Sequence, residues 1–451
     1  MKTKHESTNL ILLTSIVAFV AQTCAADGYW DARFCALGLL GGVNTVAVSG
    51  TNVYVGGSFT KAGSVNATNI ARWNGTSWSA LGNGVNDRVY AIAVQGNQVF
   101  AGGKFTQAGS VNVNFIAKWD GSSWSVLGTG ANNGVGGYVY TLAARTDGPA
   151  GVYVGGAFVV ANKSDGTSLT ANYIAQWISN SWSTLGTGVG GYVYGITVSG
   201  SNAYVGGNFT TAGSVGANHV ARWNNGWAAL TNIFGQNGVN GYVNAIAVNG
   251  SNVYVGGNFT GAAGSTGFTN IARYDYSMPA LPTWRSVGVG LNDIVLTMAA
   301  NGTNVYVGGY FTLAGTNSAK RIARWDGTSW SALSSGLSSG PDRLEPGDGQ
   351  IYVGGGFTTA GGKPSDGFAI WHETPVLRPD IVGIHFSGSD CLINFITQAG
   401  QEYYAERCNS LPSTNWYTFT NLICGFSGGI IVTDRLAAVN ATNRFYRVRS
   451  Q

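Results

Sequence analysis

Val53-Tyr54-Val55-Gly56-Gly57-Ser58-Phe59-Thr60 is one copy of a segment that recurs in seven variants along this chain of 451 residues. Successive copies lie 46 to 53 residues apart, measured at the aromatic residue that follows the Gly pair. A period of this length is typical of architectures in which each repeat forms one supersecondary unit. The aromatic residue falls at Phe59, Phe105, Phe158, Phe209, Phe259, Phe311 and Phe357.

One complete repeat, from residue 88 to residue 128, contains four short segments rich in β-branched and aromatic residues. These segments are 89–94, 99–105, 115–119 and 124–127. Asp120-Gly121 stands between the third and the fourth, and this dipeptide accepts the positive φ angles of a tight hairpin turn. The Gly pair in the second segment allows a neighbouring backbone or sheet to approach closely. Each repeat therefore predicts a small antiparallel sheet of four strands.

The two ends of the repeat region indicate how these sheets are arranged. The seventh repeat has its third strand at 368–371, but no Trp-x-x-Leu-Gly segment follows it. The missing segment occurs before the first repeat, between Trp30 and Gly38. A linear stack gives no reason to divide a repeat in this way, whereas a closed ring does. We predict an all-β fold, a seven-bladed β-propeller over residues 27–373 in which an N-terminal strand completes the last blade.

A family resemblance supports this fold. The segment Ile-Ala-Arg-Trp-Asn-Gly-Thr-Ser-Trp-Ser-Ala-Leu-Gly at 70–82, preceded by the Gly pair, resembles Kelch-type propellers. It is more similar still to repeats of secreted bacterial proteins and of fungal cortical cell-polarity markers, which share Val-Tyr-Val-Gly-Gly-x-Phe-Thr. The resemblance covers roughly residues 30 to 373 and implies the fold, because one scaffold of this kind hosts many functions.

The repeat pattern stops after His372, and a short linker containing Pro375 and Pro379 follows. Residues 374–451 hold alternating apolar runs such as 391–395 and 430–432, which predict a small β-sandwich domain. The segments 400–403, 415–416 and 444–448 resemble small C-terminal domains of exported planctomycete and verrucomicrobial proteins. That resemblance implies no chemistry.

Residues 1–26 have the pattern of a secretory signal peptide. Lys2 and Lys4 precede an apolar stretch at 10–20, and Cys24-Ala25-Ala26 offers a small-residue cleavage site. The apolar stretch is too short to span a membrane, and we predict no membrane span. We therefore expect a secreted, periplasmic or cell-surface protein. The mature chain would keep Cys35, Cys391, Cys408 and Cys424, with Cys408 and Cys424 the favoured disulfide pair and other connectivities open.

Composition excludes several functions. Only 10% of the residues are charged, and the net charge of +4 is scattered rather than clustered, so we expect no nucleic-acid partner. His219, His372 and His385 share no metal-ligand spacing. The Kelch resemblance also implies copper radical oxidases, whose copper is held by paired His and Tyr with a Tyr joined to a Cys. Here His372 is the one other propeller histidine at a plausible blade position beside His219, and Cys35 is the one propeller cysteine, which disfavours such an enzyme. We predict no cofactor and no metal.

The most informative segment is the one that departs from the repeat. Alignment without gaps places 341–346 on the first strand of the seventh blade, where the apolar residues of other blades become Asp342, Arg343 and Glu345. The first strand is innermost in a propeller and has a free edge, where Pro341 and Pro346 are tolerated. These charged side chains would stand at or near the central channel as ligand-binding candidates. An alternative is that they only pair with one another.

Further candidates lie near the ends of the blades. Asp87 and Asp293, just before the first strands of blades two and six, could reach the same channel mouth. The connections between second and third strands are the longest and most varied: 159–172, with Lys163 and Asp165, then 260–269 and 312–321. Variable loops on a rigid scaffold often carry binding residues. We therefore expect any ligand site on the rim that these loops share with the blade-to-blade connections.

Three functions remain open from the sequence. The first is an exported, non-catalytic binding or scaffold propeller that recognises an extracellular glycan or protein. The second is a glycoside hydrolase that uses Asp342 and Glu345 as acid and base, which would require a suitable separation of the two carboxylates. The third is a structural cell-surface protein with the C-terminal domain as its attachment module.

Overall fold

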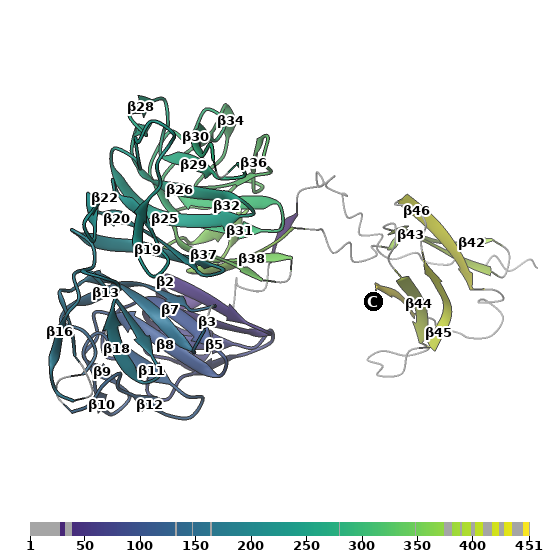
Figure 1. Ribbon diagram of the computed structural model, residues 1–451. Coiled ribbons are helices and arrows are strands. Elements are labelled where there is room, and N and C mark those ends of the chain that lie inside the picture. The colour runs from purple at the N-terminus through teal and green to yellow at the C-terminus, as the bar shows by residue number, and fades with distance from the viewer. Residues whose placement is uncertain are drawn as a thin grey trace, which may run out of the picture. The chain divides into compact units, whose positions relative to one another are not determined.

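The computed structural model describes residues 28–31 and 38–373, except 131–132, 147, 163–164, 279 and 348, and six strands between residues 381 and 450. The expected signal peptide at 1–26 and Cys35 lie outside these residues. The chain forms two compact units, Met1–Glu373 and Thr374–Gln451, which we describe separately (Figure 1). Within the described residues, no helix has the length and apolar character needed to cross a membrane.

The first unit consists of seven antiparallel sheets, or blades, each with four main strands. The first strands are β2 (Leu39–Ser49), β7 (Val89–Gln95), β13 (Tyr138–Ala144), β19 (Tyr192–Ser199), β25 (Tyr242–Asn249), β31 (Val295–Asn301) and β37 (Pro341–Gly347). The second strands are β3 (Asn52–Ala62), β8 (Gln98–Gly103), β14 (Gly151–Ala157), β20 (Asn202–Asn208), β26 (Asn252–Asn258), β32 (Asn304–Gly309) and β38 (Gln350–Gly355).

The outer half of each blade is formed by two shorter strands. The third strands are β5 (Ile70–Trp73), β11 (Ile116–Trp119), β17 (Ile174–Ile178), β23 (Val220–Trp223), β29 (Ile271–Asp275), β35 (Ile322–Trp325) and β41 (Phe368–His372). The fourth strands are β6 (Trp78–Ala80), β12 (Trp124–Ser125), β18 (Ser181–Thr184), β24 (Trp227–Ala229), β30 (Thr283–Ser286), β36 (Trp330–Ala332) and, from the N-terminus, β1 (Tyr29–Trp30).

The blades close into a ring. Each first strand contacts the first strands of both neighbouring blades, and β2 of the first blade contacts β37 of the last. The hydrophobic core is correspondingly divided into clusters that join one blade to the next, such as the cluster that packs Phe368 and Ile370 of blade seven against Val53 and Trp73 of blade one. The predicted seven-bladed propeller is confirmed.

The strand that completes the seventh blade is the predicted one. In β1, Tyr29 pairs with His372 and Trp30 pairs with Trp371 of β41. Trp30 is buried, and its Nε1 donates to the Leu333 carbonyl of blade six at 3.1 Å. Trp124 of blade two makes the same bond to Leu81 of blade one, at 2.9 Å. The N-terminal strand thus repeats the contact that joins neighbouring blades elsewhere in the ring.

The first glycine of each pair explains why the repeated segment is a scaffold element. A Cβ atom on Gly56 would lie 2.6 Å from a methyl group of Val89, in the first strand of the next blade. Gly354 of blade seven faces Val43 of blade one in the same way. Glycine at this position therefore allows adjacent sheets to pack closely.

The connections between second and third strands differ from the predicted loops, because each contains a small two-stranded hairpin. In blade four this hairpin is β21 (Thr211–Ala212) with β22 (Val215–Gly216), and in blade five it is β27 (Gly261–Ala262) with β28 (Ser265–Thr266). The equivalents are β4 (Val65–Asn66) against β3, β9 (Gln107–Ala108) with β10 (Val111–Asn112), β15 (Val160–Asn162) with β16 (Ser168–Thr170), β33 (Leu313–Ala314) with β34 (Asn317–Ser318), and β39 (Thr359–Ala360) with β40 (Lys363–Pro364).

These hairpins share one rim of the ring with the blade-to-blade connectors, as predicted. Backbone bridges join the two kinds of segment, for example between Val85 of a connector and Ala108 of the next hairpin, and between Val239 and Ala262. We refer to this side of the propeller as the hairpin rim.

The second unit contains two antiparallel sheets of three strands. One consists of β42 (Ile381–Ser387), β43 (Asp390–Thr397) and β46 (Gly428–Asp434). The other consists of β45 (Tyr417–Ile423), β44 (Glu402–Cys408) and β47 (Phe445–Ser450). The sandwich arrangement of these sheets stays a prediction. So does the Cys408–Cys424 disulfide, because Cys424 lies outside the described residues.

Candidate functional site

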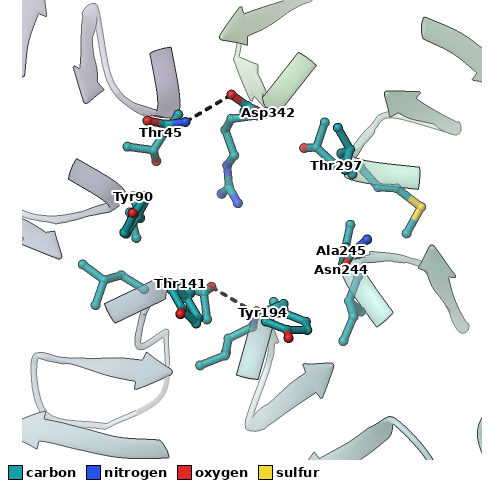
Figure 2. Close-up of a pocket in the computed structure, with 18 of the residues that line it drawn as sticks. Thr45, Tyr90, Thr141, Tyr194, Asn244, Ala245, Thr297 and Asp342 are labelled. Atoms are coloured by element: carbon teal, nitrogen blue, oxygen red, sulfur yellow. Dashed lines mark hydrogen bonds between the residues drawn. The ribbon is translucent and has the colours of Figure 1, made fainter. Parts of the chain in front are cut away.

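Every first strand contains a β-bulge at the same place, and the bulges define the wall of the central channel. In blade four the pairing of β19 with β20 skips Tyr194, between Val193 and Gly195. A bulge bends the strand and re-aims the side chain of the unpaired residue. The skipped residues are Asn44, Tyr90, Tyr140, Tyr194, Asn244, Leu296 and Asp342. All seven line a channel cavity of about 90 Å³ (Figure 2), and we call them the channel ring.

The channel ring is chemically asymmetric. Tyr90, Tyr140 and Tyr194 come from three consecutive blades, and their ring centroids are 5.9 Å apart in each successive pair. Figure 2 shows Asp342 across the channel from Tyr194. Burial raises the pKa of Tyr140 and of Tyr194, so both phenols are neutral at physiological pH. Three tyrosines on one side of the channel thus face a carboxylate on the other.

Asp342 occupies the predicted position in the channel. Its Oδ2 accepts a hydrogen bond from Asn44 Nδ2 at 3.1 Å (dashed in Figure 2). Solvent in the channel reaches the carboxylate, yet protein surrounds it on most sides. This confinement raises the pKa of Asp342 to about 6, although the Asn44 hydrogen bond and the charge of Arg88 oppose the shift. Asp342 therefore changes charge close to neutral pH.

Arg343 and Glu345 form an ion pair with one another. Arg343 Nη2 donates to Glu345 Oε2 at 2.9 Å, and the side chains are 38% and 23% exposed. Burial raises the pKa of Glu345, while the Arg343 guanidinium opposes the shift. Arg343 lines the channel cavity, whereas Glu345 is not among its lining residues. Asp342 and Glu345 thus have separate hydrogen-bond partners, and of the two only Asp342 lines the cavity, which counts against their acting as an acid and base pair.

The remaining predicted residues lie outside the channel cavity. Asp87 lies 3.8 Å from Lys104 and accepts a hydrogen bond from the Arg88 amide. Asp293 accepts the amide of Ile294 at the equivalent place in blade six. Asp165 caps its own turn by accepting the Thr167 amide, and Lys163 lies outside the described residues. The described residues contain no group of three or more His, Cys, Asp or Glu that could hold a metal ion.

A second set of aromatic side chains lies on the hairpin rim. Tyr138, Tyr192 and Tyr242 begin the first strands of blades three, four and five, and they are 39%, 45% and 48% exposed. Each meets a ring from the preceding blade edge to face, at centroid distances of 5.6, 5.6 and 6.1 Å. We call this set the aromatic arc of the rim, and its members are Phe115, Tyr138, Tyr173, Tyr192, His219 and Tyr242.

Half of this arc is held in a strained backbone conformation. Phe115, Tyr173 and His219 have φ angles of 63°, 65° and 63°, in the left-handed region. Asn69 and Asn270 occupy the equivalent place in blades one and five, where Asn tolerates this conformation better than bulky residues do. Arg321 and Gly367, with φ angles of 71° and 72°, occupy this place in blades six and seven, so the conformation belongs to the repeat and fixes where the aromatic side chains start on the rim.

Exposed apolar side chains are concentrated on the same rim. Ten of the twelve large apolar residues that are exposed in the described part of the propeller lie there. The other two, Met278 and Leu281, lie in the hairpin between β29 and β30 on the opposite rim. This one-sided distribution makes the hairpin rim the candidate binding face.

The aromatic arc was missed by our sequence reasoning, although two signals were present. The segments 137–140 and 191–194 both read Gly-Tyr-Val-Tyr, and 241–244 reads Gly-Tyr-Val-Asn, while the other blades lack the first tyrosine. In addition, Arg222 is the one formally charged side chain between Asp165 and Arg273. Blade four, and blade five as far as its third strand, therefore carry Arg222 as their one formally charged side chain before Arg273.

No protein-family model and no curated protein matches this chain. Among solved structures, the computationally designed Ika8 protein aligns with a TM-score of 0.43 and 14% identity over 74% of this chain and 97% of that one. The extracellular domain of the hybrid two component system BT4673 from B. thetaiotaomicron aligns with a TM-score of 0.48 and 12% identity, over 84% of this chain and 46% of that one. A puromycin-hydrolyzing peptidase from Mycobacterium tuberculosis aligns with a TM-score of 0.43 and 11% identity, over 82% and 61%. Similarities of this size carry no functional conclusion.

Proposed function

We propose that this protein is an exported, non-catalytic glycan-binding propeller that holds a neutral glycan on its hairpin rim. The observation that carries the proposal is the aromatic arc of the rim, with half-exposed Tyr138, Tyr192 and Tyr242 on adjacent blades. Sugar rings have apolar C–H faces that pack against aromatic rings, and their hydroxyl groups bond to phenol, amide and hydroxyl groups nearby. The rim supplies both kinds of contact.

The scarcity of charge favours a glycan over a protein partner. Protein interfaces commonly use complementary charges to steer association and fix orientation. Between Asp165 and Arg273 the chain offers only Arg222, which lies in the third strand β23 and not on the rim. A neutral polyhydroxylated ligand needs no such charges. The signal sequence expected at 1–26 would bring the protein to a compartment in which extracellular glycans are met.

A glycan array with matched variants tests this function. The triple variant Tyr138→Ala, Tyr192→Ala, Tyr242→Ala should retain its fold, because Gly42, Ile294 and Gly340 occupy the equivalent places in other blades. We expect it to lose glycan binding by tenfold or more, since aromatic anchors usually contribute at least about 1 kcal/mol each. The control variant Met278→Ala, Leu281→Ala on the opposite rim should bind like the wild type.

Two results would contradict the proposal. Wild-type protein that binds no neutral glycan on the array would remove its basis, and capture of a protein ligand by the same rim would replace it. Binding that survives in the triple tyrosine variant would mean that the glycan is held elsewhere.

A further inference from the structure

A groove separates the hairpins of blades four and five on the hairpin rim. It has a volume of about 370 Å³, within the range of small-ligand sites. Its lining residues come from the segment before the third strand of blade four, from the connector between the blades and from the hairpin of blade five: Asn218, His219, Asn237, Gly238, Val239, Asn240, Gly261, Ala263, Gly264, Ser265 and Thr266. We call this feature the blade 4–5 groove.

Both walls of the groove are places where the chain departs from its repeat. The connector from Leu230 to Val239 is longer than its counterpart from Leu185 to Val189. The connection between the second and third strands has one residue more in blade five than in blade four, counted from the Phe-Thr pair to the left-handed residue just before the third strand. Within this longer connection, Ala263 has a φ of 46°, at a place where other blades have glycine, such as Gly213. Irregularity at both walls indicates that packing of the ring alone does not require this shape.

His219 connects the groove to the aromatic arc. It lines the groove and also meets Tyr242 edge to face, with centroids 6.1 Å apart. Burial lowers the pKa of His219, opposed by the backbone of Gly207, so the imidazole is neutral at physiological pH. Its Nδ1 is buried and has no hydrogen-bond partner of good geometry among the described residues. A neutral imidazole has one donor and one acceptor nitrogen.

The other polar groups of the groove are neutral. The side-chain oxygen of Asn240 is occupied by the blade-five hairpin, because it accepts hydrogen bonds from the amides of Thr260 and Gly261. Asn218 donates through Nδ2 to the Asn237 carbonyl at 3.3 Å, and its side-chain oxygen is a further acceptor in the lining of the groove. Ser265 and Thr266 are exposed on β28 and contribute hydroxyl groups. These donors and acceptors match the hydroxyl groups of a sugar, and no formal charge would favour an ion.

We infer that the blade 4–5 groove binds a single neutral pyranose residue, with Tyr242 beside it as the platform for the next residue of the glycan. The inference rests on the proposed glycan-binding function and adds the position and class of one subsite. His219 and Asn218 form one wall, and the hydroxyl groups of Ser265 and Thr266 form the other.

Two variants and one control separate this subsite from the rest of the rim. Ser265→Trp fills the groove from an exposed hairpin position. The control Ser318→Trp places the same bulk on the hairpin strand β34 of blade six, at the exposed position that corresponds to Thr266. His219→Asn removes the imidazole but keeps a residue suited to the left-handed backbone, as at Asn69 and Asn270. In those blades the Asn Nδ2 donates to the following connector, so the fold should be retained.

The measurement is ligand-observed NMR titration of the full chain with the methyl pyranosides of glucose, galactose and mannose, with N-acetylglucosamine, and with glucuronic acid. We expect at least one neutral sugar to bind, and glucuronic acid to bind at least several-fold more weakly than its neutral counterpart. Ser265→Trp should abolish binding, His219→Asn should weaken it about fivefold or more, and Ser318→Trp should have no effect.

The outcomes distinguish the subsite from the function. If Ser265→Trp binds the sugars like the wild type, the groove is not the subsite, and glycan binding lost only in the triple tyrosine variant would leave the proposed function standing. If wild-type protein binds neither these sugars nor any glycan on the array, both proposals fail. Preferred binding of glucuronic acid would overturn the assignment to a neutral sugar.

Discussion

Asp342 illustrates how one residue can keep the packing of the repeat and change its chemistry. Its neighbour Pro341 still fills the space against Gly308 of the preceding blade, as Val243 does against Gly206. Leu344 is buried like the apolar residues of other first strands. The bulge then directs the variable side chain to the channel, where nothing in the packing dictates its identity. The charged residues of blade seven thus alter the channel and leave the ring intact.

The raised pKa of Asp342 predicts a pH-dependent stability. The folded-state pKa of about 6 exceeds the ordinary value of 3.8, so the folded protein binds more protons than the unfolded chain between these values. Stability should therefore fall as pH rises from about 4 to about 6. Asp342→Asn keeps an acceptor for Asn44 and removes the ionisable group, so its melting temperature should exceed that of the wild type increasingly over this interval.

Above pH 6 we expect the free energy of unfolding of Asp342→Asn to exceed that of the wild type by about 1 kcal/mol. This value allows for the solvent in the channel, which screens the charge of Asp342. Melting curves of both proteins at pH 4, 5, 6 and 7 would measure it. Glu345 also has a raised pKa, so the comparison uses the difference between variant and wild type, in which the contribution of Glu345 cancels. A difference that stays constant across this pH range would show that Asp342 does not titrate there.

Among the structural elements, β1 closes the ring with two residues. Its two residues supply the fourth strand of blade seven, and Trp30 contacts the ring of Trp371 edge to face at a centroid distance of 5.3 Å. Tyr29 stacks on His372 at 4.5 Å, and Asp31 lies 3.5 Å from the same histidine. These contacts join the two ends of the propeller without a covalent link.

Substitution of Trp30 tests the ring closure. Trp30→Ala removes a 3% exposed indole and its hydrogen bond to Leu333, and large-to-small changes of this kind cost about 3–5 kcal/mol. We expect urea unfolding to show a loss of this size and limited proteolysis to cut first near blade seven. The control is Phe234→Ala, which replaces an aromatic residue that is 79% exposed. A loss below about 1 kcal/mol for Trp30→Ala would show that β1 contributes little to closure.

At the scale of the whole molecule, the fold could be predicted because the sequence pattern of one blade occurs seven times. The Gly pair, the buried aromatic and the Trp of the fourth strand recur, so one misread repeat is corrected by the others. The two-residue hairpin strands, such as β21 and β22, were missed because so short a pairing leaves no hydrophobic period.

The candidate site was harder to predict because it lies in what the repeats do not share. Asp342 was found because a charge in an apolar strand is conspicuous. Tyr192 and Tyr242 were missed because a tyrosine at the end of a strand is as consistent with a buried core residue as with an exposed one. The structure shows that both are half-exposed. The groove at His219 depends on a connector and a hairpin that meet across two blades, a contact that spacing in one sequence does not specify.

The charge distribution of the whole ring leads to a last prediction, which concerns the ligand. Tyr192, Tyr242 and the groove lie in the stretch of chain between Asp165 and Arg273, where Arg222 is the one formal charge, so binding should depend little on ionic strength. The affinity for the glycan selected by the array should change less than twofold between about 50 and about 500 mM NaCl. It should also be constant from pH 8 to 7, because the lowered pKa keeps His219 neutral there, and should fall only below the ordinary histidine range. Isothermal titration calorimetry would measure how the affinity depends on salt and on pH. In the control variant His219→Asn, the affinity should no longer fall at acidic pH. A tenfold loss of affinity in high salt would instead indicate that charged residues, such as Arg88 and Asp342 at the channel, hold the ligand.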